Sequence, residues 1–145
     1  QVMFVLTPSQ KRFAKFFIVG TLAYGVDVGV LRLMQYGLGL DPYTGRLVSF
    51  LCAASFSFAG NRFFTFRDRR QGHAGKQWMA FLLVSTGGFA INYGIYALLV
   101  SLFPWLYLHP EPAVAVGCLG GMFFNFSGAS KLVFPSLEKN GDRAI

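Results

Sequence analysis

Residues 56–66 read FSFAGNRFFTF, and residues 124–134 read FNFSGASKLVF. Both segments begin Phe-x-Phe, carry Gly at the fifth position and end in Phe at the eleventh. Each of them completes a long apolar stretch of the chain. Two apolar stretches that end in the same way indicate an internal repeat.

The composition around these segments is typical of a membrane protein. Hydrophobic residues make up 54% of the 145 residues and charged residues only 13%, whereas a soluble domain carries about a quarter charged residues. The formal net charge is +7, but the basic residues flank the apolar stretches and do not line one face of a soluble fold. We therefore expect a membrane as partner and no nucleic acid.

Four stretches are long enough to cross a bilayer as helices, for which about 20 apolar residues are needed. Helix is favoured over strand because backbone polar groups in lipid need partners within the segment or in a closed barrel. The sequence predicts an all-α integral membrane protein with one domain over residues 1–145. The four expected spans cover about 13–35, 46–66, 78–102 and 113–134.

The positions of the basic residues predict the orientation of the spans. Eleven of the 13 Lys and Arg lie before the first span, around the loop between the second and third spans, or at the C-terminal end. The positive-inside rule places those three regions, and hence both termini, in the cytoplasm. No signal-peptide pattern precedes the first span, so we expect this span to direct its own insertion.

The repeat extends beyond the two quoted segments. They lie 68 residues apart, and the first and third spans match at an offset of 65, which aligns Phe16 with Phe81 and Asp27 with Asn92. The chain thus reads as two tandem copies of a two-helix unit. Copies with an even number of spans face the same way and are related by an axis along the membrane normal.

Polar side chains inside the spans are candidate ligands for a substrate. Asp27 is an acid deep in the first span, where a charge costs about 2.5–3.5 kcal/mol on insertion scales. It would need a partner, a water-filled cavity or a proton, and an interhelical hydrogen bond is an equally good interpretation. Asn92 is its neutral counterpart, for which a structural role is favoured, and Asn125 of the fourth span is a further candidate.

Cations near the span ends are candidate ligands for an anionic lipid headgroup. Arg62 follows Asn61 at one end of the second span, and Lys131 occupies a comparable level in the second copy. An Arg that extends to the lipid headgroups is the alternative interpretation of Arg62. Arg32 and Arg46 are the corresponding cations on the outer side. Cations at both surfaces with a polar middle suit an anionic cargo that crosses the membrane.

Gly25-x-x-x-Gly29 in the first span and Gly117-x-x-x-Gly121 in the fourth span have the spacing that allows helices to approach closely. We expect these faces to pack against helices and not against lipid, and the sequence leaves open whether the partner helix belongs to the same chain. No phosphate-binding loop of the Walker type and no hydrolase triad motif occurs. The sequence therefore predicts neither an enzyme nor a cofactor, catalytic residue or metal site.

The chain resembles the GtrA-like family of small bacterial membrane proteins. The resemblance covers about residues 12–135. It is carried by RFAKFFIVGTLAYGVDVGVLRLM at 12–34, FSFAGNRFFTFR at 56–67, FLLVSTGGFAINYGIYALL at 81–99 and FFNFSGASKLVF at 123–134.

This resemblance implies a function. GtrA-like proteins are associated with moving polyprenyl-phosphate-linked sugars across the bacterial cytoplasmic membrane, where the sugar is later used to decorate cell-surface polymers. By motif position, Asp27, Asn61 and Arg62 carry over as the binding residues. The fourth span departs from the second-span ending, since it has Gly-Ala-Ser-Lys where the second has Gly-Asn-Arg-Phe.

Four helices enclose little volume, so we expect a homo-oligomer, most simply a dimer, and membrane glycosyltransferases as further partners. Two other functions remain open from the sequence. One is a non-transporting scaffold that recruits a glycosyltransferase, and the other is a small proton-coupled cation exporter, against which the strong charge bias argues.

Overall fold

A computed structural model describes residues 5–40, 42–70, 72–109 and 111–136. Every regular element in these residues is helical. The four long helices are α1 (Pro8–Arg32), α2 (Pro42–Gly60), α3 (Ala74–Leu102) and α5 (Glu111–Gly128). The short elements are the π-helical turns η1 (Leu33–Gly37), η2 (Asn61–Thr65) and η4 (Ala129–Val133), the 3₁₀ turn η3 (Arg67–Arg69) and the helix α4 (Pro104–Leu108).

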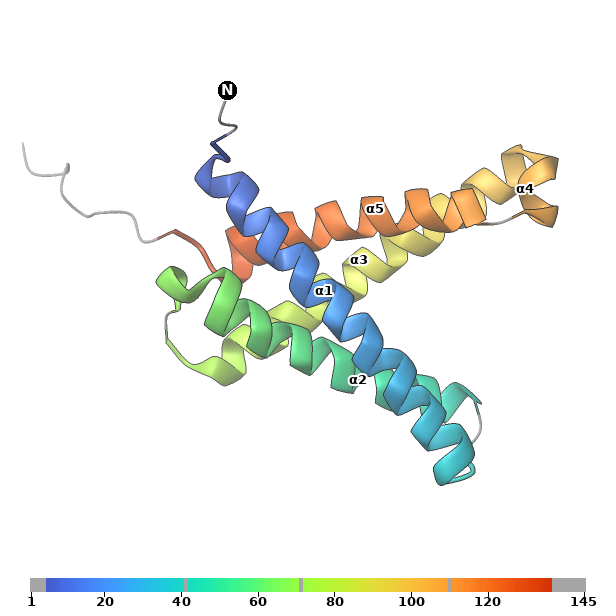
Figure 1. Cartoon of the computed structure of the whole chain (residues 1–145), viewed down its shortest axis with the longest axis horizontal. Helices are drawn as coiled ribbons and strands as arrows, with labels where there is room; N and C mark the ends of the chain where they lie inside the picture. Colours follow the sequence, from blue (N-terminus) through green and yellow to red (C-terminus); the bar gives the residue numbers. More distant parts are fainter. Residues whose placement is uncertain (1–4, 41, 71, 110, 137–145) are drawn as a thin grey trace, which may run out of the picture.

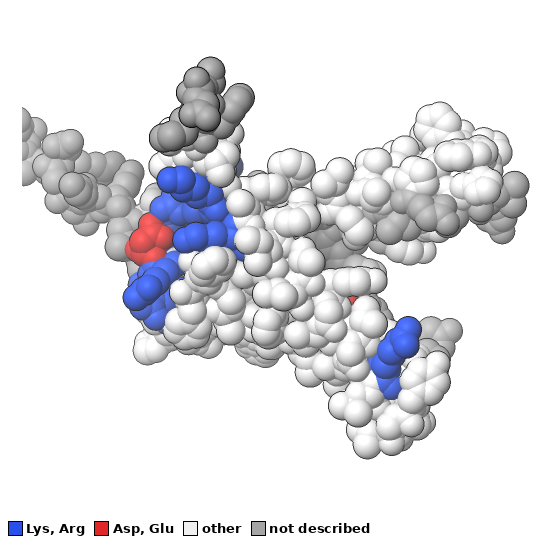
Figure 2. Space-filling model, in the orientation of Figure 1, with Lys and Arg blue, Asp and Glu red and all other residues white. Residues whose placement is uncertain are grey.

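The long helices form two hairpins. Helix α1 packs along α2, and α3 packs along α5. The hairpins come together at the end of the molecule where α1 begins and α2 and α5 finish, and they separate toward the opposite end (Figure 1). We call the first end the basic end, because Lys and Arg side chains gather there (Figure 2). The opposite end holds the connections within the two hairpins.

Three helical segments in the described part of the chain are long and apolar enough to cross a membrane: Pro8–Gly37, Leu47–Thr65 and Ala74–Leu102. They coincide with the first three predicted spans. The fourth predicted span is also helical, from Glu111 through the end of η4 at Val133. The described part of the chain is therefore all-helical, with three candidate membrane spans.

Helix α1 begins five residues earlier than the predicted span. The Thr7 hydroxyl accepts a hydrogen bond from the backbone N–H of Gln10 at 3.2 Å, and the Gln10 side chain accepts one from the backbone N–H of Thr7 at 2.8 Å. This reciprocal capping box, with Pro8 at the first helical position, satisfies backbone donors that the start of a helix leaves unpaired. The start of α1 is thus set by polar capping and not by where the apolar run begins.

Helices α2 and α5 end in the same unusual way, at positions 68 residues apart. The backbone N–H of Phe66 donates to the carbonyl of Asn61, and that of Phe134 donates to the carbonyl of Ala129, each at 2.7 Å. A hydrogen bond to the fifth residue back closes a π-helical turn, which is wider than an α-helical one. Phe66 and Phe134 follow these turns and are each 0% exposed.

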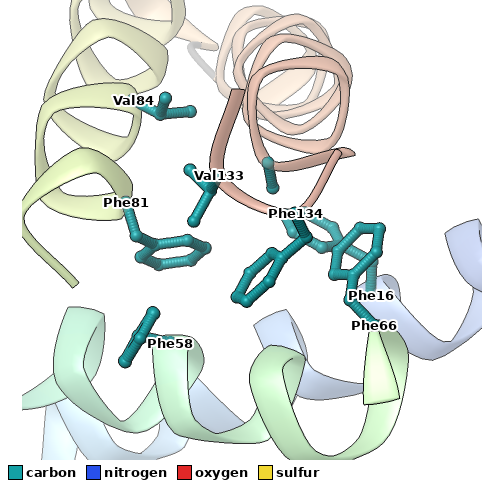
Figure 3. Close-up of a cluster of buried hydrophobic side chains, with 8 residues drawn as sticks. Phe16, Phe58, Phe66, Phe81, Val84, Val133 and Phe134 are labelled. Carbon is teal, nitrogen blue, oxygen red and sulfur yellow. The ribbon is translucent and has the colours of Figure 1, made fainter. Parts of the chain in front are cut away.

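The two phenylalanines are the centre of an aromatic core that joins the hairpins at the basic end. Their ring centroids lie 5.0 Å apart with planes inclined by 12°. Figure 3 shows the surrounding rings of Phe16, Phe58 and Phe81 directed into the same cluster from the neighbouring helices. Stacked aromatic pairs add about 0.5–1.5 kcal/mol beyond the packing of their area.

The other rings of the core contact one another in matching pairs. Phe58 of α2 lies 5.8 Å from Phe81 of α3, and Phe126 of α5 lies 5.5 Å from Phe16 of α1. Each second helix of a hairpin thus contacts the first helix of the other hairpin. Phe58 and Phe126 are 68 residues apart in the chain, and Phe16 and Phe81 are 65 apart.

The two Gly-x-x-x-Gly motifs behave differently. A Cβ at Gly117 would lie 2.6 Å from the backbone oxygen of Asn92, and one at Gly121 would lie 2.8 Å from the backbone oxygen of Gly88, so α5 and α3 approach as the spacing predicts. A Cβ at Gly25 or Gly29 would meet no atom within 4 Å. The α5 motif therefore packs against a helix of the same chain, whereas the α1 motif contacts no helix in the described part of this chain. The expectation for the α1 motif stays a prediction that needs a helix of another chain.

Candidate functional site

A cleft of about 440 Å³ lies between the two hairpins, and all four long helices line it. Its wall is formed largely by small and aromatic residues, among them Phe16, Ala54 and Gly88. It lies beside the aromatic core, because Phe16 and Phe81 belong to both the core and the lining of the cleft. Beyond this core the two hairpins separate (Figure 1). The cleft exists because the rings of the core hold the hairpins together at only one end.

Each long helix contributes polar side chains to the cleft. Asp27 comes from α1, Ser57 from α2, Ser85 and Asn92 from α3, and Asn125 from α5. Three of these, Asp27, Asn92 and Asn125, are candidate residues from the sequence, and the structure brings them to one cavity. Polar groups inside a membrane domain are costly and are typical of a substrate path.

Asn125 has a buried oxygen that makes no hydrogen bond within the described part of the chain. Its side chain lies against Gly88, where a Cβ would overlap the Asn125 amide. An unsatisfied buried acceptor costs about 1–3 kcal/mol. A ligand in the cleft that carries a hydroxyl or amide donor would remove this cost.

Asn92 lies where α3 and α5 are closest. Its side-chain nitrogen is 3.6 Å from the sulfur of Cys118, which also lines the cleft. A sulfur atom is a weak acceptor, so this contact leaves the Asn92 amide capable of binding a stronger partner. The close approach at Gly117 and Gly121 holds the Asn92 backbone in place.

A second cavity, of about 730 Å³, lies at the basic end between the start of α1 and the segment that follows α2. We call it the basic pocket. Its lining includes Phe63 and Phe64. It also includes five cationic side chains and one acidic side chain, which are Lys11, Arg12, Lys15, Arg67, Arg70 and Asp68. Figure 2 shows Lys and Arg side chains gathered over the beginning of α1, with acidic atoms beside them.

The Arg12–Asp68 ion pair closes one side of the basic pocket, with Nη2 and Oδ2 2.6 Å apart. Burial alone would raise the pKa of Asp68, but the hydrogen bond and charge of Arg12, a backbone hydrogen bond and the charge of Arg69 together hold that pKa below its ordinary value. Asp68 therefore stays ionised at neutral pH. For Arg69, burial and the charge of Arg12 lower the pKa, and Asp68 partly offsets them.

Two further arginines, Arg62 and Arg69, take part in hydrogen bonds that connect the two hairpins. Arg62 donates to the side-chain oxygen of Gln77, and Gln77 in turn donates to the backbone oxygen of Val133 at 3.1 Å. Arg69 Nη1 lies 3.3 Å from the backbone oxygen of Ser130. These side chains satisfy carbonyls that the end of a helix leaves without partners.

Asn61, a candidate residue from the sequence, lines neither the cleft nor the basic pocket. It is 0% exposed, and its amide is used inside the end of its own helix. The Thr65 hydroxyl donates to Asn61 Oδ1 at 2.7 Å, and Asn61 Nδ2 donates to Ser57 Oγ at 3.3 Å. The structure thus gives Asn61 a place in the η2 turn.

The remaining candidate cations lie apart from the cleft. Lys131 is exposed on η4 at the basic end, and Arg32 is exposed at the opposite end of α1. Arg46 belongs to α2, but its side chain lies outside the described part of the structure. Cations therefore occur near both ends of the helices, as predicted, without forming one site.

Sequence reasoning missed the basic pocket, because its five cations were interpreted only as orientation signals. One signal was available. Lys11 and Lys15 are four residues apart, which places them on one face of a helix that starts before them. Their meeting with Arg67 and Arg70 depends on the turn after Phe66 and had no sequence pattern.

Comparison with known families settles what kind of chain this is. A family model described as GtrA/DPMS, transmembrane domain, matches residues 15–134. The chain belongs to this GtrA/DPMS family. The predicted resemblance to GtrA-like proteins is therefore confirmed. Comparison with curated proteins finds no match.

The residues matched by the GtrA/DPMS model include the lining of one cavity completely and that of the other only in part. It contains the whole lining of the cleft, from Phe16 to Asn125. The basic pocket extends beyond it, since Lys11 and Arg12 precede the matched residues and Lys15 is the first of them. The cleft is thus part of the GtrA/DPMS domain, whereas the basic pocket is lined both by that domain and by residues that precede it.

Proposed function

We propose that this protein moves a polyprenyl-phosphate-linked monosaccharide across the bacterial cytoplasmic membrane for glycosylation of cell-surface polysaccharide, and that it is a transporter and not an enzyme. The observation that carries the proposal is the cleft between the hairpins, in which Asp27, Asn92 and Asn125 meet. Membership of the GtrA/DPMS family supports it.

The arrangement in the membrane is part of the proposal. Four helices cross the bilayer, with both termini and the basic end in the cytoplasm. The distribution of charge supports this orientation, because the basic end holds the cations at the start of α1 and those of η2, η3 and η4. Arg32, the last residue of α1, lies at the other end. Lys139 and Arg143, which we also expect in the cytoplasm, lie outside the described residues.

We propose further that the four spans are two tandem two-helix repeats related by an axis along the membrane normal. Three relationships support the repeat: the matching π turns before Phe66 and Phe134, the exchange of ring contacts between hairpins, and equivalent glycines. A Cβ at Gly60 would lie 2.8 Å from Val19, and one at Gly128 would lie 2.5 Å from Val84. The axis then runs through the stack of Phe66 on Phe134.

The chemistry of the cargo fits a polar cleft that is bounded by apolar helices. The isoprenoid tail stays in lipid, so only the sugar and phosphate need a polar path. Sugar hydroxyls are donors and acceptors, and each suits a different group in the cleft. Asn125 Oδ1 would accept from a hydroxyl, the Asn92 amide would donate to one, and the Asp27 carboxylate would accept.

A homodimer and contacts with membrane glycosyltransferases remain part of the proposal. The open backbone at Gly25 and Gly29 supports the dimer, because a second helix can approach closely where a Cβ would meet nothing.

The test is reconstitution of the purified full chain into liposomes with a fluorescent polyprenyl-phosphate sugar, followed by the transfer of that lipid between leaflets. We expect the wild-type chain to accelerate transfer and Asp27→Asn and Asn125→Leu to reduce it at least tenfold. Thr86→Ala is the matched control, because Thr86 is a polar residue of α3 that bonds to its own helix at Leu82 and does not line the cleft.

Wild-type liposomes that show no acceleration would favour the scaffold that recruits a glycosyltransferase. If Thr86→Ala reduced the rate of lipid transfer as much as Asn125→Leu, transport would not depend on the cleft, and the proposed path would be refuted.

A further inference from the structure

The basic pocket has a composition that neither the repeat nor the orientation of the protein requires. The positions equivalent to Arg12 and Lys15 in the second half are Gln77 and Ala80, and that equivalent to Arg67 is Pro135. Both halves share the aromatic core and the π turns, but the cations that line the basic pocket all come from the first half. A charge needed only for orientation would not have to line a cavity.

Side-chain contacts hold several of these cations in place. Lys15 Nζ lies 4.9 Å from the ring centre of Phe64, and the Arg70 guanidinium lies 5.3 Å from that of Phe63. Contacts of a cation with an aromatic face contribute about 0.5–1 kcal/mol at exposed sites. A phosphate that enters the pocket would thus meet cations that are already positioned.

The charges in the pocket are not balanced. Asp68 is paired with Arg12, and no other acidic residue among those that the structure describes lines the pocket. Four cations therefore remain in the described lining: Lys11, Lys15, Arg67 and Arg70. Lys and Arg are the side chains that bind phosphate oxygens through charge-assisted hydrogen bonds, and Arg does so with two parallel donors. An anion with two charges would be bound more strongly here than an anion with one.

The aromatic residues of the pocket indicate that the anion is carried by a lipid. Phe63 is 59% exposed and Phe64 47% exposed, and both lie on the lining beside the cations. Exposed rings next to cations at the edge of a membrane domain suit a ligand with an apolar chain attached to a phosphate. Free phosphate would use the cations and gain nothing from the rings.

We propose that the basic pocket binds the terminal phosphate of a membrane lipid and prefers a dianionic phosphomonoester to a monoanionic phosphodiester. The loaded carrier in the proposed function is a phosphodiester, and the carrier without its sugar is a phosphomonoester. The pocket therefore binds the discharged carrier, the lipid phosphate without its sugar. This lipid is the substrate of any reaction that attaches a sugar to a lipid phosphate. This place in the cycle rests on the proposed function, whereas binding to the pocket does not.

The test measures binding to the full chain in nonionic detergent by isothermal titration calorimetry at pH 8. The probes are farnesyl phosphate, its methyl diester and inorganic phosphate. We expect farnesyl phosphate to bind at least tenfold more tightly than either of the others. Against the monoanionic diester, one additional charge-assisted hydrogen bond corresponds to about this factor. Inorganic phosphate is also largely dianionic at pH 8, but it lacks the apolar chain that contacts Phe63 and Phe64. Diester or inorganic phosphate that binds as tightly as farnesyl phosphate would overturn the proposal.

Variants then place the site. Lys15→Gln, which removes one charge from the pocket, is expected to abolish the preference for farnesyl phosphate. Lys76→Gln is the matched control, because Lys76 is exposed, occupies the position equivalent to Lys11 in the second half and does not line the pocket. If Lys76→Gln weakened binding as much as the pocket variant, the preference would come from the net charge and the pocket would play no part.

A pH series on the wild-type chain tests the proposal without a substitution. The second pKa of a phosphomonoester is about 6, so between pH 8 and pH 5 farnesyl phosphate loses one charge and its diester loses none. The charged groups of the described lining that face the ligand are the three cations at the start of α1, with Arg67, Asp68 and Arg70. The lowered pKa of Asp68 keeps it ionised at pH 5. The preference should therefore disappear at pH 5, and a preference that persisted there would contradict the dianion as ligand.

These outcomes are independent of the transport assay. Selective binding of farnesyl phosphate without accelerated lipid transfer would support the proposed phosphate site and refute the proposed transport. Accelerated lipid transfer without selective binding would support the proposed transport and refute the phosphate site.

Discussion

Phe66 and Phe134 are stacked face to face at the junction of the two hairpins, 5.0 Å apart, with both rings fully buried. Each follows a π turn that ends the second helix of its hairpin. The pair joins the two halves at one end and leaves them free to separate at the other, so it explains both the cohesion of the fold and the position of the cleft.

The first prediction concerns this pair. Phe66→Ala and Phe134→Ala should each lower the free energy of unfolding by about 3 kcal/mol, because each leaves a cavity in the core. The double variant should cost about 1 kcal/mol less than the sum, since the stacking is lost only once. Unfolding in mixed micelles measures this, with Phe89→Ala as control because Phe89 is 56% exposed. Strict additivity would show that the two rings do not interact.

The second prediction concerns the glycines of α3. Gly88→Ala should destabilise the α3–α5 hairpin, because the new methyl group would overlap the Asn125 amide. Gly94→Ala on the same helix should be neutral or slightly stabilising, because a Cβ there meets nothing within 4 Å. Thermal unfolding of both variants in detergent is the measurement. Similar midpoints for the two would contradict the close approach of α3 and α5 at Gly88.

The third prediction concerns the Arg12–Asp68 ion pair. The folded-state pKa of Asp68 is lowered, so the ionised carboxylate stabilises the fold above its unfolded pKa of about 3.9. This contribution is lost as the pH falls through the folded-state pKa. The side chains of Arg12 and Asp68 are 25% and 60% exposed, so the contribution should be below about 1 kcal/mol. Asp68→Asn should thus be slightly destabilising at pH 7 and neutral near pH 2; an equal cost at both would contradict this origin.

The fourth prediction concerns the orientation in the membrane. A cysteine at position 73 should react with an impermeant maleimide only from the cytoplasmic side, and one at position 38 only from outside. Both positions are exposed, at opposite ends of the helices. Native Cys52 and Cys118 are exposed on the chain and need replacement first. Labelling of position 73 from outside would reverse the proposed topology.

Several of these features could be predicted from the sequence, because they depend on local pattern. Apolar length identified three of the spans, and the repeated ending of residues 56–66 and 124–134 indicated equivalent positions for Phe66 and Phe134. Other features depend on tertiary contacts that leave no pattern. The π turns before Phe66 and Phe134 place those two rings in the core, and the basic pocket results from the meeting of Lys15 and Arg70.

The candidate site was predicted in part for the same reason. Asp27 and Asn92 are conspicuous in sequence because they are polar groups in apolar spans, and they do line one cleft. Asn61 is equally conspicuous, but its amide is used within its own helix end. Sequence shows that a polar residue is present in a span, and only packing shows whether the residue faces a cavity.

The most direct test of the central claim is to locate the sugar during passage. A polyprenyl-phosphate sugar with a diazirine on its sugar ring is photolysed with the full chain in liposomes, and the insertion sites are mapped by mass spectrometry. We predict insertion at Tyr24 and Phe89, which line the cleft, and not at Leu22 or Ile91, which lie at similar depth and outside its lining. Insertion at Leu22 and Ile91 with none at Tyr24 and Phe89 would contradict passage through the cleft.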